Sequence, residues 1–171
     1  MPTFPLPSTT ALSREYIRLS LFLLKFGLIT HFTLSHIGTL TPTTGPSMLP
    51  TISVRGDVMY TNKLYTRGNG IKLGDLVDFK HPLVVGEAGC KRVMGLGGDF
   101  VCDGEEGAGR MIQVPEGHCW VLGDNLSASR DSRTYGPLPL ALIKGRVTAR
   151  IWPLSAVGWM KNTLQRPEDG I

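Results

Sequence analysis

The chain has 171 residues, a net charge of +4 and 42% hydrophobic residues, which is enough for one folded domain with an appendage. This apolar content excludes wholesale disorder, and the basic residues form no dense block of the kind that binds nucleic acid. The 21 glycines and 12 prolines favour many short elements joined by turns over a bundle of long helices.

The N-terminal region divides into a polar lead and an apolar run. Residues 1–15 are rich in proline, serine and threonine and are predicted to form a disordered lead. Residues 16–41 have about the length of a bilayer-spanning helix and are predicted to anchor the protein in a membrane. Arg14, Arg18 and Lys25 lie toward the N-terminal end of the region, which leaves the N-terminus in the matrix or cytoplasm and sends the rest across.

Lys25 counts against a span, because a lysine held at the bilayer centre costs about 2.5–3.5 kcal/mol. On a helix, Arg18, Lys25 and His36 share one face, which also fits a helix lying flat on the membrane surface. A cleaved secretory signal is a third alternative, although no small-residue cleavage site ends the run cleanly. Of the three, the sequence favours a span.

Residues 42–171 are predicted to form one β-rich domain. Short β-prone pieces alternate with turns, among them "DVMYTNKLY", "DLVDF", "CKRVMGL" and "IKGRVTARIWPL". Their spacing of roughly 8–15 residues, with glycine and proline between them, is typical of an antiparallel sandwich or barrel. No helix-length pattern and no internal repeat follows the N-terminal run.

The three cysteines, Cys90, Cys102 and Cys119, have neither C-x-x-C spacing nor the nearby histidines of a zinc site. Their odd number argues against a full disulfide framework, so they are interpreted as small buried hydrophobic residues. The sequence therefore predicts no metal site and no cofactor.

Ser47 lies in "GPSMLPT", which is neither the G-x-S-x-G elbow nor the S-x-x-K motif of other serine enzymes. A nucleophilic serine needs a base within hydrogen-bond reach. His31 and His36 lie in the apolar run, His81 precedes a proline and His118 opens a predicted strand, and none has an evident carboxylate partner. The other candidate base is a neutral lysine, since burial lowers the pKa of lysine by as much as about 3–5.

Lys91 fits this requirement if "GCKRVMGL" is a strand. Alternation places Lys91 and Val93 on one face, and Cys90, Arg92 and Met94 on the other. Lys91 then points into an apolar interior, while Arg92 keeps its charge in solvent. Periodicity by itself does not distinguish this arrangement from two adjacent basic residues on the surface of an edge strand.

Three motifs in this order resemble the type I signal peptidase family: "GPSMLPT", "CKRVMGLGGD" and "GDNLSASRDSRTYGP". Each motif is weak alone, but the ordered set is specific and covers roughly residues 20–160. The resemblance implies a mainly β fold, an antiparallel sandwich or barrel with a single N-terminal membrane-anchoring helix. It also implies that Ser47 is the catalytic nucleophile and Lys91 the general base of a Ser-Lys endopeptidase.

The resemblance assigns supporting roles to residues of the third motif. Ser129 matches the hydroxyl that hydrogen-bonds and orients the lysine. Asp131 and Arg133 match an ion pair that braces the loop, and a turn beneath the lysine is formed by Gly123, Asp124 and Asn125. The backbone N–H of Ser47 is expected to donate to the oxyanion, and Gly45 stands where some bacterial members carry a second, hydroxyl-bearing donor.

The short mitochondrial members of the family are the closest match. They imply removal of sorting presequences from proteins delivered to the intermembrane space, by a single-pass inner-membrane enzyme with its catalytic domain on that side. They also imply a heteromer with a second catalytic subunit, with precursor proteins and membrane lipid as the other partners. The alternatives are a non-catalytic assembly subunit, a bacterial or plastid leader peptidase, and a self-cleaving repressor. A repressor would need a DNA-binding module, and residues 1–40 offer none.

Overall fold

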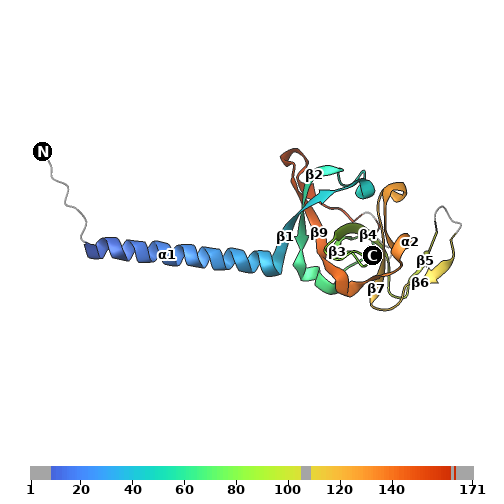
Figure 1. Cartoon of the computed structure of the whole chain (residues 1–171), viewed down its shortest axis with the longest axis horizontal. Helices are drawn as coiled ribbons and strands as arrows, with labels where there is room; N and C mark the ends of the chain where they lie inside the picture. Colours follow the sequence, from blue (N-terminus) through green and yellow to red (C-terminus); the bar gives the residue numbers. More distant parts are fainter. Residues whose placement is uncertain (1–8, 105–108, 163, 165–171) are drawn as a thin grey trace, which may run out of the picture. The chain divides into compact units, whose positions relative to one another are not determined.

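The structure is a computed structural model that describes residues 9–104, 109–162 and 164. The chain forms two compact units, one ending at Ile37 and one beginning at Gly38 (Figure 1). The first unit is helical, and the second is built almost entirely of β-strands.

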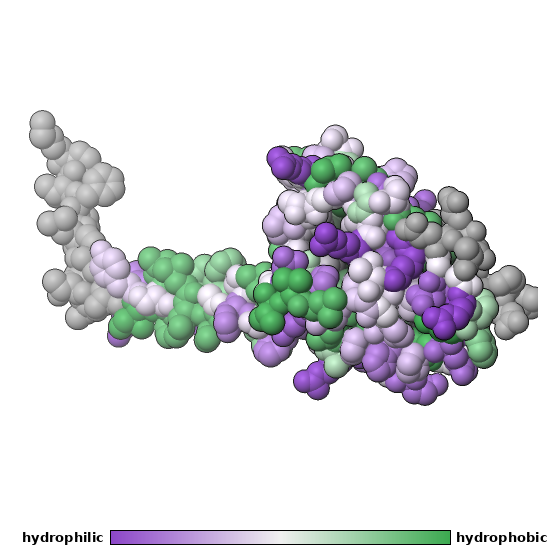
Figure 2. Space-filling view, turned by 45° about the vertical axis from the view of Figure 1, so that its right-hand side comes forward, coloured by the Kyte–Doolittle hydropathy of each residue, from purple (hydrophilic) through white to green (hydrophobic). Residues whose placement is uncertain are grey.

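The helical unit is α1 (Thr9–Phe32), followed by a π-helical turn at Thr33–Ile37. The segment Arg14–Ile37 has 24 residues and a mean hydropathy of 1.4. Its apolar side chains are exposed along the helix (Figure 2). At a rise of about 1.5 Å per residue the segment is roughly 36 Å long, more than the hydrocarbon core of about 30 Å. It is therefore long and apolar enough to cross a membrane.

Both predicted boundaries of this segment differ from the structure. Thr9–Glu15 is helical rather than a disordered lead, and residues 1–8 lie outside the described residues. At the other end the helical part stops at Ile37, four residues before the predicted boundary at residue 41, and Gly38–Thr44 is a strand. Gly38 and Pro42 are poor helix formers, and β-branched threonines between them favour an extended backbone.

The second unit contains a short helix, α2 (Ser132–Tyr135), and ten strands among its described residues. The strands are β1 (Gly38–Thr44), β2 (Arg55–Asn62), β3 (Leu76–Lys80), β4 (Ala88–Leu96), β5 (Phe100–Cys102), β6 (Met111–Gln113), β7 (His118–Leu122), β8 (Leu138–Pro139), β9 (Ile143–Trp152) and β10 (Gly158–Trp159). Short 3₁₀ turns at Pro46–Met48, Lys63–Gly68, Leu126–Ala128, Leu140–Leu142 and Leu154–Ala156 connect them.

The main sheet is antiparallel throughout, with the strand order β1-β2-β9-β3-β4-β7-β8 and β10 added to β9. Strands β5 and β6 form a separate hairpin. Burial alternates along β9 from Ile143 to Arg150, as expected for a strand with one face against the core. This mainly antiparallel architecture with one N-terminal apolar helix confirms the predicted fold class.

Three apolar clusters fill the domain. The first lies around Phe79 and Val93, the second around Met59 and Leu76, and the third packs Trp120 under the β5–β6 hairpin. Cys119 belongs to the first cluster and is fully buried, as predicted, whereas Cys90 and Cys102 are only half-buried. All three cysteines are free.

Strands β1 and β4 are four steps apart in the order of the main sheet, yet residues of β1 and of the first half of β4 line the same cavity. We call the space between these two strands the gap. Among the strands that the structure describes, β1 is an edge strand and pairs with β2 alone. Strand β4 pairs with β3 over Ala88–Arg92, but its pairing with β7 starts only at Arg92. The four antiparallel steps from β1 to β4 make these two strands run in the same direction. Both run toward the segment that carries Ser47.

We predict that a variant beginning at Gly38 folds and melts cooperatively, since it keeps every strand of the domain. A matched variant beginning at Gly45 lacks β1, which pairs with β2 at six positions. At about 1 kcal/mol for each net hydrogen bond it should lose about 3–5 kcal/mol of stability. Thermal unfolding followed by circular dichroism compares the two, and equal melting temperatures would contradict the placement of β1 in the domain.

Candidate active site

Ser47 lies in a tight turn directly after the edge strand β1. Gly45 has a φ of 105°, which an L-residue rarely adopts, and its N–H donates to the carbonyl of Val54 at 2.8 Å. The 3₁₀ turn Pro46–Met48 follows, and the side chain of Met48 is buried in the second apolar cluster. Gly45 thus allows the tight turn that precedes Ser47. Met48, which follows Ser47, anchors the turn in the apolar core.

Lys91 projects from β4 to the hydroxyl of Ser47, with 2.7 Å between Nζ and Oγ. The lysine side chain is only 7% exposed. Burial lowers the pKa of Lys91 below its usual range, and the nearby Asp131 and Asp124 carboxylates oppose this effect. The structure therefore joins the predicted nucleophile and the predicted base across 44 residues of sequence.

The four histidines are engaged elsewhere. His31 and His36 belong to the helical unit. Nδ1 of His81 accepts from the N–H groups of Leu83 and Val84, and Nδ1 of His118 lies 3.1 Å from the carbonyl of Glu116. Among the described residues, none of the histidines is hydrogen-bonded to Ser47, and no group of three or more His, Cys, Asp or Glu side chains is placed to hold a metal ion.

The loop after β7 holds the backbone on both sides of the Ser47 side chain. The N–H of Asn125 donates to the carbonyl of Ser47 at 3.0 Å, and its side-chain amide donates to the carbonyl of Pro46 at 3.2 Å. Gly123 is packed against the same point: a Cβ there would lie 2.2 Å from Oγ of Ser129 and 2.5 Å from the carbonyl oxygen of Ser47. Only glycine fits this close approach.

Asp131 and Arg133, predicted to pair, lie 2.9 Å apart. The Asp131 carboxylate is fully buried, accepts from the N–H of Gly123 at 3.0 Å and caps the N-terminus of α2. Burial raises the pKa of Asp131, but the Arg133 guanidinium and the Gly123 N–H outweigh it and hold the pKa below its usual range. Arg133 also donates to the carbonyl of Leu126 at 2.7 Å, so the pair fixes the loop at several points.

Ser129 lies against Gly123, on the side of the Ser47 carbonyl. Its hydroxyl helps to lower the pKa of Asp131, yet no hydrogen bond of ordinary geometry joins it to any group that the structure describes. In particular, Lys91 bonds to Ser47 and not to Ser129. The role of Ser129 in orienting the lysine remains a prediction.

Arg92 corrects the sequence interpretation, because it is buried rather than in solvent. It is 8% exposed and binds both oxygens of Asp124, at 2.8 and 2.7 Å. Its third contact is to the carbonyl of Gly74 at 2.9 Å. Alternation predicts a solvent-exposed face of β4 with Cys90, Arg92 and Met94, but only Met94 of these is exposed, and Cys90 lines the same cavity as Lys91.

The Arg92–Asp124 pair connects three segments of the site. Arg92 comes from β4, the strand that also carries Lys91, and Asp124 comes from the loop that holds Ser47. The same carboxylate accepts from the hydroxyl of Thr51, four residues after Ser47. Burial raises the pKa of Asp124, but the bonds from Arg92 and Thr51 more than offset it and hold the pKa below its usual range. The network is thus a charged brace around the Ser47–Lys91 contact.

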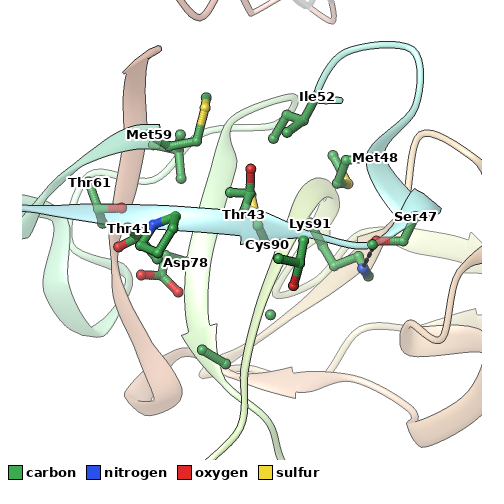
Figure 3. A pocket seen from close by; sticks show the side chains of 16 residues that line it. Thr41, Thr43, Ser47, Met48, Ile52, Met59, Thr61, Asp78, Cys90 and Lys91 are labelled. Carbon is green, nitrogen blue, oxygen red and sulfur yellow. Dashed lines mark hydrogen bonds between the residues drawn. The ribbon is translucent and has the colours of Figure 1, made fainter. Parts of the chain in front are cut away.

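A cavity of about 180 Å³ opens beside the Ser47–Lys91 pair and extends between β1 and β4 (Figure 3). Apolar side chains such as Met48 and Met59 line part of it, and Asp78, Thr41 and Thr61 lie at the end away from Ser47. Sequence reasoning missed these three polar residues. The available signal was an acidic residue inside the strand-like "DLVDF".

The chain matches a known family of enzymes over most of its length. Residues 13–107 and 103–152 match the family described as signal peptidase, peptidase S26. The chain belongs to this family and is a serine peptidase, which confirms the predicted family and enzyme class.

Its relatives are named for a mitochondrial enzyme. The chain is 42% identical over 144 residues to the mitochondrial inner membrane protease subunit 1 of Xenopus tropicalis, covering 83% of this chain and 86% of that protein. For the subunit 1 of Homo sapiens the identity is 39% over 146 residues, with coverage of 84% and 87%. For the subunit 2 of Danio rerio it is 35% over 130 residues, with coverage of 73% and 69%.

The chain is accordingly a peptidase of the mitochondrial inner membrane, and α1 fits the part of its single-pass anchor. This agrees with the predicted location and disfavours the bacterial, plastid and repressor alternatives.

Replacing Arg92 by glutamine should lower the free energy of unfolding by about 3–5 kcal/mol, because Asp124 is left buried without its charge partner. The matched control is Arg55→Gln at the exposed start of β2, which should change stability by less than about 0.5 kcal/mol. Chemical denaturation measures both variants. An Arg92→Gln variant as stable as Arg55→Gln would show that the brace contributes nothing.

Gly123→Ala should reduce peptidase activity at least about ten-fold, because the added Cβ pushes the Ser47 carbonyl or the Ser129 hydroxyl out of place. Gly158→Ala, in β10, is the control, since a Cβ there meets nothing within 4 Å. Initial rates on a peptide substrate compare the two variants. Undiminished activity in Gly123→Ala would mean that this close approach is not needed for cleavage.

Proposed function

We propose that Ser47 is the nucleophile and Lys91, in its neutral form, the general base of an endopeptidase. The observation that carries the proposal is the 2.7 Å contact between Lys91 Nζ and Ser47 Oγ, made by a lysine that is 7% exposed. An intact contact of this kind also argues against a subunit that keeps the fold without the chemistry.

The chemistry needs the lysine to cycle between its amine and its ammonium form. Neutral Nζ accepts the proton of the Ser47 hydroxyl while Oγ attacks the carbonyl carbon of the substrate. The ammonium then returns that proton to the leaving amine as the C–N bond breaks. Water, deprotonated by the same amine, then attacks the acyl carbon, and the ammonium returns this proton to Oγ of Ser47 as the ester bond breaks. Burial makes this cycle feasible near neutral pH, because it disfavours the charged form of Lys91.

The oxyanion that forms in this step is proposed to accept from the backbone N–H of Ser47. A second donor from the side chain at position 45 is disfavoured, since the φ of 105° at Gly45 strains any residue with a Cβ. Asp131, Arg133, Gly123, Asp124 and Asn125 are proposed to support the site by holding the turn and the loop, and Ser129 to orient the lysine.

The substrate is proposed to lie as an extended strand between β1 and the first half of β4. Both strands present an unpaired edge there, over Gly38–Thr44 and Ala88–Lys91. Backbone hydrogen bonds from both edges would hold any peptide of suitable shape, with its scissile carbonyl at Ser47. This is β-strand addition of the kind that gives affinity through the main chain.

The physiological substrates are proposed to be precursors delivered to the intermembrane space, from which the enzyme removes sorting presequences. The positive residues Arg14 and Arg18, at the N-terminal end of the segment Arg14–Ile37, favour an N-terminus in the matrix and a catalytic domain on the opposite side. Relatives named subunit 1 and subunit 2 support assembly with a second, homologous catalytic subunit.

The first test replaces the two proposed catalytic residues. Ser47→Ala and Lys91→Arg should each lower kcat/KM at least about 10³-fold and leave the melting temperature within a few degrees. The first variant lacks the nucleophile, and the second carries a guanidinium that stays protonated. Lys80→Arg, at the exposed end of β3, should retain full activity. A Ser47→Ala variant that still cleaves would disprove the mechanism.

The second test is the pH profile of kcat/KM. The active form has Lys91 neutral, so activity falls about ten-fold for each pH unit below the lysine pKa and rises with pH through it. Because burial holds this pKa below the usual value of 10.5, the midpoint of the rising limb should lie below that pH. His81→Gln and His118→Gln should keep the same rising limb. A limb that disappears in either histidine variant would instead identify a histidine base.

A further inference from the structure

After β9 the chain runs back along the edge of that strand as an extended strap, which we define as residues 158–162. Its first two residues are β10, and the N–H of Met160 continues the pairing by donating to a carbonyl of β9 at 2.9 Å. Side chains of an extended segment point alternately to opposite sides. Trp159 and Lys161 are exposed, whereas Met160 and Asn162 are half-buried. The strap therefore has an outer face and an inner face.

Met160, on the inner face, attaches the strap to the apolar core. Its side chain packs against the second apolar cluster, the one that also contains Met48. Met48 is the residue that anchors the turn of Ser47. The strap and the turn that carries the proposed nucleophile thus rest on the same group of side chains.

Asn162, also on the inner face, binds the turn that precedes β3. Its Nδ2 donates to the carbonyl of Leu73 at 2.6 Å and lies 3.3 Å from Oδ1 of Asp75. Gly74 stands between these two residues with a φ of 84°, and a Cβ there would lie only 2.1 Å from Oδ1 of Asn162. The amide of Asn162 therefore holds the turn at residues 73–75 from both of its ends.

The same turn is bonded to β4, the strand of Lys91. The N–H of Gly74 donates to the carbonyl of Val93 at 2.7 Å, and the N–H of Val93 donates to the carbonyl of Asp75 at 2.9 Å. The carbonyl of Gly74 accepts from Nη1 of Arg92 at 2.9 Å, while the other two nitrogens of Arg92 bind Asp124. One guanidinium thus joins the turn to the loop after β7.

We propose that Asn162 is a positioning residue of the peptidase and acts through Arg92. Asn162 fixes the turn at residues 73–75, and the turn fixes one side of the guanidinium. Because a guanidinium is planar and rigid, its direction sets the place of Asp124 on its other side. The loop that carries Asp124 also holds the backbone of Ser47. The proposal rests on the proposed function, since it takes Ser47 as the group that reacts.

This route predicts which kinetic constant changes. The lining of the cavity in the gap, as far as the structure describes it, includes no residue of the strap and none of residues 73–75. Loss of the Asn162 contact therefore leaves the surface that binds substrate intact. It lets the reacting groups shift, and a shift of about 1 Å can slow the chemical step by as much as about 10²-fold. The effect should appear in kcat and not in KM.

The experiment measures kcat and KM of the full-length protein in detergent, on one peptide substrate, at a temperature where every variant is folded. Asn162→Ala should lower kcat about ten-fold and change KM less than about two-fold. Lys161→Ala, on the outer face, should match the wild type. Val114→Ala leaves a cavity in the third apolar cluster and controls for lost stability, so its kcat should stay within about two-fold of the wild type.

A second substitution tests the route through Arg92. Arg92→Lys keeps a positive charge beside Asp124, but the single nitrogen of lysine cannot bind both the carboxylate and the carbonyl of Gly74. In this background Asn162→Ala should lower kcat by less than a further two-fold or so, about what is expected when the connecting bond is already absent.

Two results would overturn the proposal. One is a loss of kcat in Asn162→Ala that is no larger than the loss in Val114→Ala. The other is a full ten-fold loss, or about that, when Asn162→Ala is added to Arg92→Lys, because two independent residues give additive effects. Ser47→Ala is measured alongside: cleavage by that variant would mean that the proposed function fails, whereas its inactivity together with a fully active Asn162→Ala would mean that only the positioning role fails.

Discussion

The burial of one amine against one hydroxyl is the constraint on which the rest of the site depends. The proposed role of Lys91 as a base requires a lysine that is neutral near physiological pH, and here burial is what lowers its pKa. A dry site also raises the cost of every other charge nearby. The domain meets this cost by pairing its buried carboxylates with arginines: Asp124 with Arg92, and Asp131 with Arg133. The buried ion pairs therefore accompany the buried lysine and keep the nearby carboxylates from standing without a charge partner.

The ion pair between Arg92 and Asp124 also shows why residues far apart in the sequence are needed at the site. Ser47 and Lys91 lie on segments with no direct strand pairing between them, so their contact needs a third segment to fix both. The loop after β7 performs this task through Asn125, which bonds to the backbone at Ser47, and Asp124, which bonds to the neighbour of Lys91. Because the loop is itself held by a buried ion pair, its position is a property of the folded core.

Sequence patterns predicted the strands and the apolar helix, and a motif singled out the two residues, Ser47 and Lys91, that the structure brings into contact. Sequence patterns do not predict the burial of a residue correctly where that burial depends on partners far away in the sequence. Arg92 was expected in solvent because alternation assumes one wet face, and only the folded loop supplies Asp124 to cover it. Asp78 and Thr61 were overlooked for the same reason: strand register, not sequence, brings them to the cavity. The predicted helix boundaries at residues 16 and 41 differ from the structure because composition changes gradually along the chain, whereas the backbone hydrogen bonds of the helix begin and end at particular residues.

The gap between β1 and β4 has a consequence for the state of the substrate. A sheet that lacks one strand offers its binding energy only to an extended backbone, since a helix has already satisfied its own N–H and C=O groups. A hydrophobic sorting segment is stable in the membrane as a helix and has to unwind before it can fill the gap. With the substrate bound as proposed, the scissile bond would therefore lie where the precursor leaves the lipid and its backbone is no longer helical.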